Sequence, residues 1–265
     1  MEKSFNSRLL DRCNVTNNRL CIGLDIDPDK LPSNVSGFDS ISIFIKEIID
    51  STIDFCPVYK PNLAFYERFG SKGFALLESV VSHIGDRAIT IADGKRGDIG
   101  NTSKYYADAI FNEFGFDAIT VSPYMGSDSI TPFIEDSSKG AFVLCLTSNN
   151  SAKDFQFISK EDIPLYQTVA NKVKSLNENN NLGLVVGATN EEQMSALRDN
   201  SNLLSWLIPG IGAQGGDLEA SVKIGNRNGI GIINGSRSII YAGNGSINDI
   251  SESALNYTKK IRSFL

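Results

Sequence analysis

Short apolar runs alternate with amphipathic helical patterns from one end of the chain to the other, and this alternation constrains the fold more than any other feature. Runs that are apolar on both faces and separated by helices predict parallel strands joined by βαβ crossovers. Eight such units in about 250 residues are the expected size of a (β/α)8 barrel. The predicted strands are 20–25, 58–61, 88–93, 118–121, 141–146, 182–187, 206–209 and 231–234, and the predicted helices are 40–52, 73–83, 103–114, 165–176, 191–199, 217–225 and 247–264.

The alternative to a barrel is an open, doubly wound sheet. That fold would lead us to expect a glycine-rich fingerprint after the first strand, but segment 23–28 reads Gly-Leu-Asp-Ile-Asp-Pro. No linker rich in proline or serine divides the 265 residues. We therefore predict an α/β fold with a single (β/α)8 TIM barrel, in which residues 1–265 form one catalytic domain. Segments 148–162 and 177–181 are predicted loops, and the first is long enough to act as a lid.

Composition narrows the class of function. A net charge of -6 argues against a general nucleic-acid-binding surface, so an anionic ligand would need a local positive site. No apolar run approaches the roughly 18 residues of a membrane span. Residues 1–6 lack a basic start followed by an apolar stretch, so no signal peptide is predicted. We expect a cytoplasmic protein.

Cysteine and histidine usage argues against several kinds of catalytic site. His83 is the single histidine, which removes HExxH zinc hydrolases and argues against a Ser-His-Asp triad. It follows a helical pattern and is expected near the end of that helix. The four cysteines are scattered without a CxxC pair, which indicates buried thiols in a reducing cytosol and predicts no metal site: Cys13, Cys21, Cys56 and Cys145.

The segment 93–100, Asp-Gly-Lys-Arg-Gly-Asp-Ile-Gly, carries the strongest chemical signal. It places two carboxylates and two cations within six residues, directly behind an apolar strand. Asp93 and Lys95 lie two apart, so in an extended chain they point the same way, and Asp98 follows a turn eased by Gly97. Such a carboxylate-ammonium-carboxylate set suits proton transfer next to an anionic substrate. A solvated turn with ordinary ion pairs is the alternative.

Polar residues collect at the predicted carboxyl ends of the strands, where a barrel carries its active site. If these segments were mere surface loops, we would expect equal polarity at both ends of the strands. The residues concerned are Asp25 and Asp27, Lys60 and Asn62, Asp93 and Lys95, 147–149, 209–216 and 234–237.

The last two of these strand ends resemble an anion site. Four glycines within 210–216 let backbone N–H groups approach a ligand, and the helix predicted from residue 217 offers its N-terminus to negative charge. Arg237 adds a guanidinium suited to bidentate phosphate binding, and barrels often bind phosphate at this place. A flexible turn remains the alternative for the glycine-rich loop.

These motifs together resemble a known family. Asp93-x-Lys95-x-x-Asp98 is similar to the signature of orotidine 5'-phosphate decarboxylase, and other motifs are similar to its longer bacterial form, type 2. The resemblance spans nearly the whole chain. It is carried by 60–67, 91–102, 120–126, 185–189, 209–216 and 234–237.

The resemblance implies metal-free and cofactor-free conversion of orotidine 5'-phosphate (OMP) to UMP and CO2. It implies that Lys95 protonates C6 as the carboxylate departs, while Asp93 lies against the substrate carboxylate. Lys60 and Asp98 would complete an alternating network that keeps Lys95 charged. Asp98 would come from the partner subunit, with Ile99 and Thr102 nearby, so a homodimer with shared active sites is implied.

The resemblance also implies the residues that bind substrate. Asp25 would bind ribose with Lys60, Ser148 the pyrimidine edge, and Pro209 would border the base. A structural role is the alternative for each of Asp25, Ser148 and Pro209. The remaining substrate-binding residues implied are Asn62, Ile99 and Thr102, Gln214 between base and phosphate, and Gly235, Ser236 and Arg237 at the phosphate.

Two other functions compete with this interpretation. Related 3-keto-L-gulonate 6-phosphate decarboxylases and hexulose phosphate synthases share the Asp-x-Lys-x-x-Asp motif but need magnesium. Lys60-Pro-Asn, the Gln214 loop and the long fifth loop favour nucleotide binding instead. The other alternative is a sensor that binds a phosphate ligand without catalysis. The presence of all four charged residues of the network argues against it: Lys60, Asp93, Lys95 and Asp98.

Overall fold

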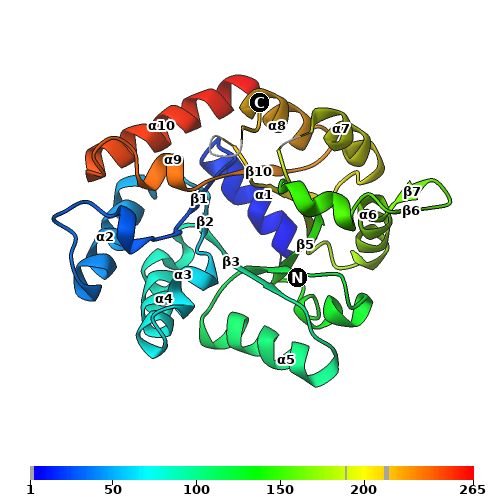
Figure 1. Cartoon of the computed structure of the whole chain (residues 1–265), viewed down its shortest axis with the longest axis horizontal. Coiled ribbons are helices and arrows are strands. Elements are labelled where there is room, and N and C mark those ends of the chain that lie inside the picture. The colour runs from blue at the N-terminus through cyan, green and yellow to red at the C-terminus, as the bar shows by residue number, and fades with distance from the viewer. Residues whose placement is uncertain (1–2, 189, 212–214) are drawn as a thin grey trace.

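Parallel strands close into a barrel in the computed structural model, which describes residues 3–188, 190–211 and 215–265 (Figure 1). Around the barrel, neighbouring strands follow the order β1-β10-β9-β8-β5-β4-β3-β2. This arrangement confirms the predicted (β/α)8 architecture. Its strands are β1 (Leu20–Gly23), β2 (Val58–Lys60), β3 (Ile89–Arg96), β4 (Ala118–Val121), β5 (Gly140–Leu146), β8 (Leu182–Val186), β9 (Ser205–Ile208) and β10 (Gly231–Gly235).

Helices between the strands form an outer ring around the barrel (Figure 1). Two predicted helices and one predicted strand agree residue for residue with α6, α10 and β4. The predicted helix 103–114 begins earlier and ends in a π-helical turn at Ala109–Glu113. No helix in the described ranges is long and apolar enough to cross a membrane. The helices are α1 (Phe5–Val15), α2 (Phe38–Thr52), α3 (Leu63–Glu67), α4 (Ser71–Ile84), α5 (Gly100–Asp108), α6 (Leu165–Leu176), α7 (Glu191–Asn200), α8 (Leu218–Gly225), α9 (Arg237–Ile240) and α10 (Ile247–Phe264).

The N-terminal helix α1, which the sequence analysis missed, lies across the barrel and belongs to its interior core (Figure 1). Phe5, Leu9 and Cys13 recur every four residues on one face of α1 and are buried. Phe5 packs edge-to-face on Phe142 of β5, with 5.9 Å between ring centroids. Helix α1 therefore closes one end of the barrel and excludes water from its interior. The carboxyl ends of the strands form the open end.

The loop predicted over 148–162 has more structure than expected. It contains a 3-10 turn at Asn150–Asp154 and the first strand of a small hairpin formed by β6 (Ser159–Lys160) and β7 (Ile163–Pro164). The hairpin extends away from the barrel beside α6 (Figure 1). The segment predicted as a loop at 177–181 does connect α6 to β8.

Candidate active site

Lys60, Asp93 and Lys95 meet at the carboxyl ends of β2 and β3. Lys60 Nζ lies 2.7 Å from Asp93 Oδ2, and Lys95 Nζ lies 2.5 Å from Asp93 Oδ1. The Lys60 side chain is 4% exposed, whereas that of Lys95 is 49% exposed. One ammonium group is therefore fixed beneath the carboxylate, and the other stands at the surface of the site where a substrate can reach it.

Mutual attraction sets the protonation of the buried pair. Burial by itself would raise the pKa of Asp93, but the charges and hydrogen bonds of Lys60 and Lys95 outweigh it and hold this pKa well below its usual range. Burial by itself would lower the pKa of Lys60, but Asp93 and Asp25 outweigh it and raise this pKa above its usual range. Asp93 is therefore a carboxylate and Lys60 an ammonium group at neutral pH.

A break in strand register shapes the backbone that carries these groups. Ala92 of β3 pairs with Ile119, and pairing resumes with Arg96 opposite Val121. Lys95 has a φ of 46°, the left-handed region that non-glycine residues rarely adopt. The strand does continue through Arg96 as an extended segment, but it bulges at 93–95, and the Asp93 and Lys95 side chains meet. Gly97 lies in the connection between β3 and α5, and the positive φ in this connection, 53°, belongs to Gly100.

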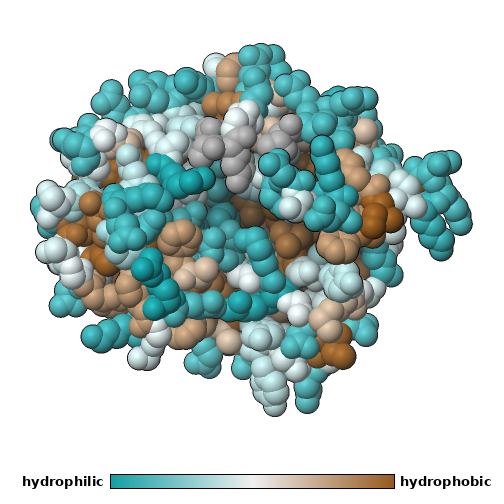
Figure 2. Space-filling view, viewed as in Figure 1, coloured by the Kyte–Doolittle hydropathy of each residue, from teal (hydrophilic) through white to brown (hydrophobic). Residues whose placement is uncertain are grey.

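Two adjoining cavities open at this end of the barrel, and both are lined by Lys60, Asp93 and Pro209. The larger, about 490 Å³, includes Lys95 and Ser148. The smaller, about 170 Å³, includes Asp25, which follows β1, and Asn234 of β10. Figure 2 shows a hollow near the centre of this face, where hydrophilic and hydrophobic surfaces meet. Together the cavities combine the charged groups of Lys60 and Asp93 with apolar side chains in the larger cavity and polar side chains in the smaller one.

Besides Pro209, the smaller cavity holds three further predicted binding residues, Asp25, Ser236 and Arg237. Asp25 Oδ1 is buried and has no hydrogen-bond partner among the described residues. The exposed Arg237 side chain likewise forms no ion pair within the described ranges. A side chain at Gly23 would lie 1.8 Å from Ser236 Oγ, so the bare backbone of β1 leaves room for Ser236. An acceptor and a cation are thus available to a polar ligand.

Other predicted site residues are placed differently. Asn62 caps α3, where its Oδ1 accepts a hydrogen bond from Ala64 N at 3.2 Å, and it lines neither cavity. Gly235 is buried at the end of β10 and also lines neither cavity. Gln214 lies outside the described residues. The sequence motif thus predicts that Asn62 and Gly235 bind substrate. In the structure, Asn62 caps a helix and Gly235 ends a strand.

Asp98, Ile99 and Thr102 lie outside the cavities of their own chain. Asp98 Oδ1 accepts a hydrogen bond from Ile99 N at 2.8 Å, and no ion pair to Asp98 occurs in the described part of the chain. Ile99 and Thr102 are exposed at the start of α5. The fourth charged residue of the predicted network therefore does not join the other three within one subunit.

The N-terminus of α8, which the sequence analysis expected to bind an anion, already has a carboxylate partner. Asp217 is the N-cap of α8, and its Oδ1 accepts a hydrogen bond from Ala220 N at 2.8 Å. A carboxylate already occupies this helix end, so it is poorly suited to hold a phosphate as well. Of the residues expected to contact phosphate, Ser236 and Arg237 line the smaller cavity.

Several residues of the larger cavity escaped the sequence analysis. Gln156 accepts a hydrogen bond from Thr147 N at 2.9 Å and donates one to Thr147 Oγ1 at 2.7 Å, which ties the two ends of the loop after β5 together. The sequence could have indicated Thr120, since it is the polar residue within an apolar strand. It could not have indicated the apolar wall of the cavity, because these residues are typical of any buried strand: Leu144, Val185 and Leu207.

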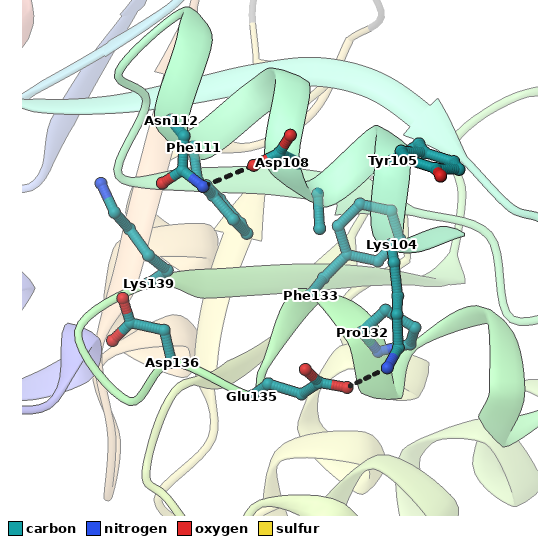
Figure 3. A pocket seen from close by; sticks show the side chains of 11 residues that line it. Lys104, Tyr105, Asp108, Phe111, Asn112, Pro132, Phe133, Glu135, Asp136 and Lys139 are labelled. Carbon is teal, nitrogen blue, oxygen red and sulfur yellow. Dashed lines mark hydrogen bonds and ion pairs between the residues drawn. The ribbon is translucent and has the colours of Figure 1, made fainter. Parts of the chain in front are cut away.

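Another cavity, about 410 Å³, lies outside the barrel between α5 and the segment after β4 (Figure 3). Lys104 Nζ lies 3.8 Å from Glu135, and Asn112 donates to Asp108 at 2.6 Å. Lys139 donates to a backbone carbonyl at 2.9 Å. These polar groups are engaged within the chain, unlike Asp25 Oδ1 at the barrel mouth. The barrel mouth is therefore the candidate active site.

Fold and site together define a class: a (β/α)8-barrel enzyme with a lysine-aspartate-lysine cluster beside a polar pocket suited to an anion. Comparison with known proteins identifies the family. Residues 18–246 match the "Orotidine 5'-phosphate decarboxylase / HUMPS family". The chain belongs to this family, as the sequence motifs predicted.

The family description joins two names, and the individual relatives show which of them applies to proteins similar to this chain. The orotidine 5'-phosphate decarboxylase of Dehalococcoides mccartyi (strain CBDB1) is 48% identical over 91% of this chain and 90% of its own length. That of Christiangramia forsetii is 46% identical over 86% and 85%. The structure of Leishmania donovani OMP decarboxylase matches with a TM-score of 0.87 and 35% identity, over 98% of both chains. These relatives fall in the orotidine 5'-phosphate decarboxylase branch.

Proposed function

We propose that this chain decarboxylates OMP by direct proton transfer from Lys95, in a site that a second subunit completes. The activity follows from the family and its relatives: the chain is an orotidine 5'-phosphate decarboxylase, which forms UMP in pyrimidine biosynthesis. The observation that carries the mechanism is the placement of the Asp93 carboxylate between two ammonium groups, at 2.7 and 2.5 Å.

The cluster supplies charge of the right sign at each stage. The substrate carboxylate approaches Asp93, and their repulsion disfavours the bound ground state. As the C6–carboxylate bond breaks, CO2 leaves and its electron pair stays on C6. The ammonium group of Lys95 then donates a proton to C6, which gives UMP and a neutral lysine that solvent reprotonates. Lys60 holds Asp93 in place throughout. No metal or organic cofactor takes part in this proposal.

The cavities suggest how the nucleotide lies across the barrel mouth. Asp25, with its unpartnered buried oxygen, would accept a hydrogen bond from a ribose hydroxyl next to Lys60. Ser148 and Pro209 border the larger cavity, where the pyrimidine fits. Ser236 and Arg237 supply a local positive site for the phosphate within a chain whose net charge is -6. Asn62, Gly235 and Gln214 remain predicted contacts.

A homodimer with shared sites forms part of the proposal. Asp98, Ile99 and Thr102 do not line the cavities of their own chain, and large apolar side chains nearby are exposed. Tyr105 on α5 is 71% exposed and Tyr124 after β4 is 86% exposed. An exposed apolar surface of this kind favours association. In a symmetric dimer, Asp98 of each subunit would then complete the partner's charged network.

We also propose that residues 1–265 act as one catalytic domain in the cytoplasm. Apart from the small β6–β7 hairpin, the strands form one closed barrel, and the helices that surround it come from the whole length of the chain. The four cysteines are free and buried, as is usual for a protein of a reducing compartment.

An ultraviolet assay with OMP tests the proposed activity. Purified protein should consume OMP at the same rate with and without EDTA. It should leave 3-keto-L-gulonate 6-phosphate unchanged in the presence of magnesium. Loss of OMP turnover with EDTA, restored by magnesium, would favour the metal-dependent branch of the family. Binding of UMP without any OMP turnover would instead indicate a phosphate-ligand sensor.

A further inference from the structure

Thr120 is a buried polar residue in an otherwise apolar strand. It lies in β4 between Ile119 and Val121 and is 1% exposed. Its neighbours in the wall of the larger cavity include the apolar residues Leu144 and Val185. Burying a hydroxyl among such residues costs free energy unless it is hydrogen-bonded, so its partners indicate what it does.

Both partners of the Thr120 hydroxyl belong to the charged cluster. Thr120 Oγ1 donates a hydrogen bond to Asp93 Oδ1 at 3.0 Å and accepts one from the backbone N–H of Lys95, also at 3.0 Å. We propose that Thr120 is a positioning residue for decarboxylation: one hydroxyl fixes both the Asp93 carboxylate and the backbone that carries the proton donor. This inference rests on the roles proposed for Asp93 and Lys95.

The register break explains why the backbone needs this support. Between the pairs Ala92–Ile119 and Arg96–Val121, the three residues 93–95 of β3 lie opposite the single residue Thr120. Regular pairing therefore cannot satisfy every backbone group of the bulge, and the Lys95 N–H bonds to the Thr120 side chain instead. The left-handed φ of Lys95 is a strained conformation that persists only where its surroundings enforce it.

Substrate binding makes the hydroxyl more important for Asp93. A substrate carboxylate repels Asp93, and the half-exposed Lys95 side chain can turn toward the new anion. Lys60 then still holds Oδ2, and Thr120 still holds Oδ1. Because threonine is β-branched and buried, its hydroxyl has little freedom to move. Loss of this contact should therefore affect the chemical step more than nucleotide binding.

The test compares Thr120→Val, which removes the hydroxyl at nearly constant volume, with Thr120→Ser, which keeps it. We expect Thr120→Val to lower kcat by about 10- to 100-fold, as for a small misplacement of reacting groups. The Kd for UMP should change less than about threefold, and Thr120→Ser should restore kcat to within about fivefold of wild type. Thr120→Ala, measured in parallel, provides the same comparison if the valine variant does not fold.

Thr90→Val is a matched control. The hydroxyl of Thr90, on β3 at the opposite end of the barrel, also donates to a carboxylate (Asp117, 3.0 Å) and accepts a backbone N–H (3.1 Å). This variant should lose thermal stability while keeping the wild-type kcat. A Thr120→Val enzyme with wild-type kcat, or equal losses in the valine and serine variants, would overturn the inference. An active Lys95→Ala enzyme would instead overturn the proposed roles on which it rests.

Discussion

At the scale of single residues, Asp93 is the centre of the site because three donors converge on its carboxylate. Lys60 binds one oxygen, while Lys95 and Thr120 bind the other. Removing one member of a buried ion pair leaves its partner uncompensated, which is more costly than never having had the pair. The stability of the protein should therefore depend on Asp93 as much as its activity does.

Asp93→Asn tests this dependence through pH. Because the pKa of Asp93 is lowered, its stabilisation is present above the ordinary carboxyl pKa of about 4 and is lost as pH falls toward the folded-state pKa. Because the pKa of Lys60 is raised, its stabilisation is present below about pH 10 and is lost at higher pH. Wild type should exceed the variant by about 3 kcal/mol in free energy of unfolding between about pH 5 and 9.

Urea denaturation at several pH values measures this difference, which should shrink below about pH 4. Asp11→Asn is the control, since its ion pair with Lys3 is exposed and should contribute little at any pH. A difference for Asp93→Asn that grows on acidification would contradict the assigned direction of the pKa shift.

At the scale of elements, the sequence predicts which strand ends carry chemistry. Lys60, Asp93 and Lys95 were identifiable because charge directly after an apolar strand is costly unless it serves a site. The barrel was identifiable because strands that are apolar on both faces must be covered by helices. These are local signals, and the structure brings the three residues together.

Features that depend on distant partners were not predictable in the same way. The bulge in β3 is set by its register with β4, which no local pattern encodes. Helix α1 has only a narrow apolar stripe, and its burial depends on the closed barrel above it. The cap formed by Asp217 likewise changes what the end of α8 can bind. Sequence motifs thus located the site, and tertiary contacts determined its details.

Arg237 tests the element that follows β10. Arg237→Ala should weaken binding of UMP by about 2–4 kcal/mol, since it removes a charge-assisted bidentate contact with phosphate. Orotidine, which lacks the phosphate, should bind equally to both enzymes. Arg227→Ala is the control, because Arg227 pairs with Asp199 on the surface and should leave UMP binding unchanged. Calorimetric titration gives the affinities, and equal losses for both ligands would assign Arg237 to the fold instead.

Within the whole molecule, Lys60, Asp93 and Lys95 contact one another, whereas Asp98 of the same chain lies outside their cavity. In the proposed homodimer, a second copy would cover Asp98 and the exposed apolar side chains of Ile99 and Tyr105. A dimer would therefore supply both the missing carboxylate and cover for this surface.

Mixing two inactive variants tests whether the sites are shared. In a heterodimer of Lys95→Ala and Asp98→Ala subunits, one site inherits both changes and the other inherits neither. Random exchange makes about half of the dimers mixed, each with one intact site of two, so activity should approach about a quarter of wild type. Exchange is checked separately with differently tagged subunits. No recovery after confirmed exchange would place Asp98 in its own subunit's site.

We propose that Lys95 is the proton donor for decarboxylation, and the activity of Lys95→Ala with OMP tests this role. Lys95→Ala removes the proton donor and one of the two ammonium groups that offset the charge of Asp93, so kcat/KM should fall by several orders of magnitude. Circular dichroism should show that the variant remains folded, since the Lys95 side chain is half-exposed and Lys60 still pairs with Asp93. A folded Lys95→Ala enzyme that forms UMP at close to the wild-type rate would contradict the account.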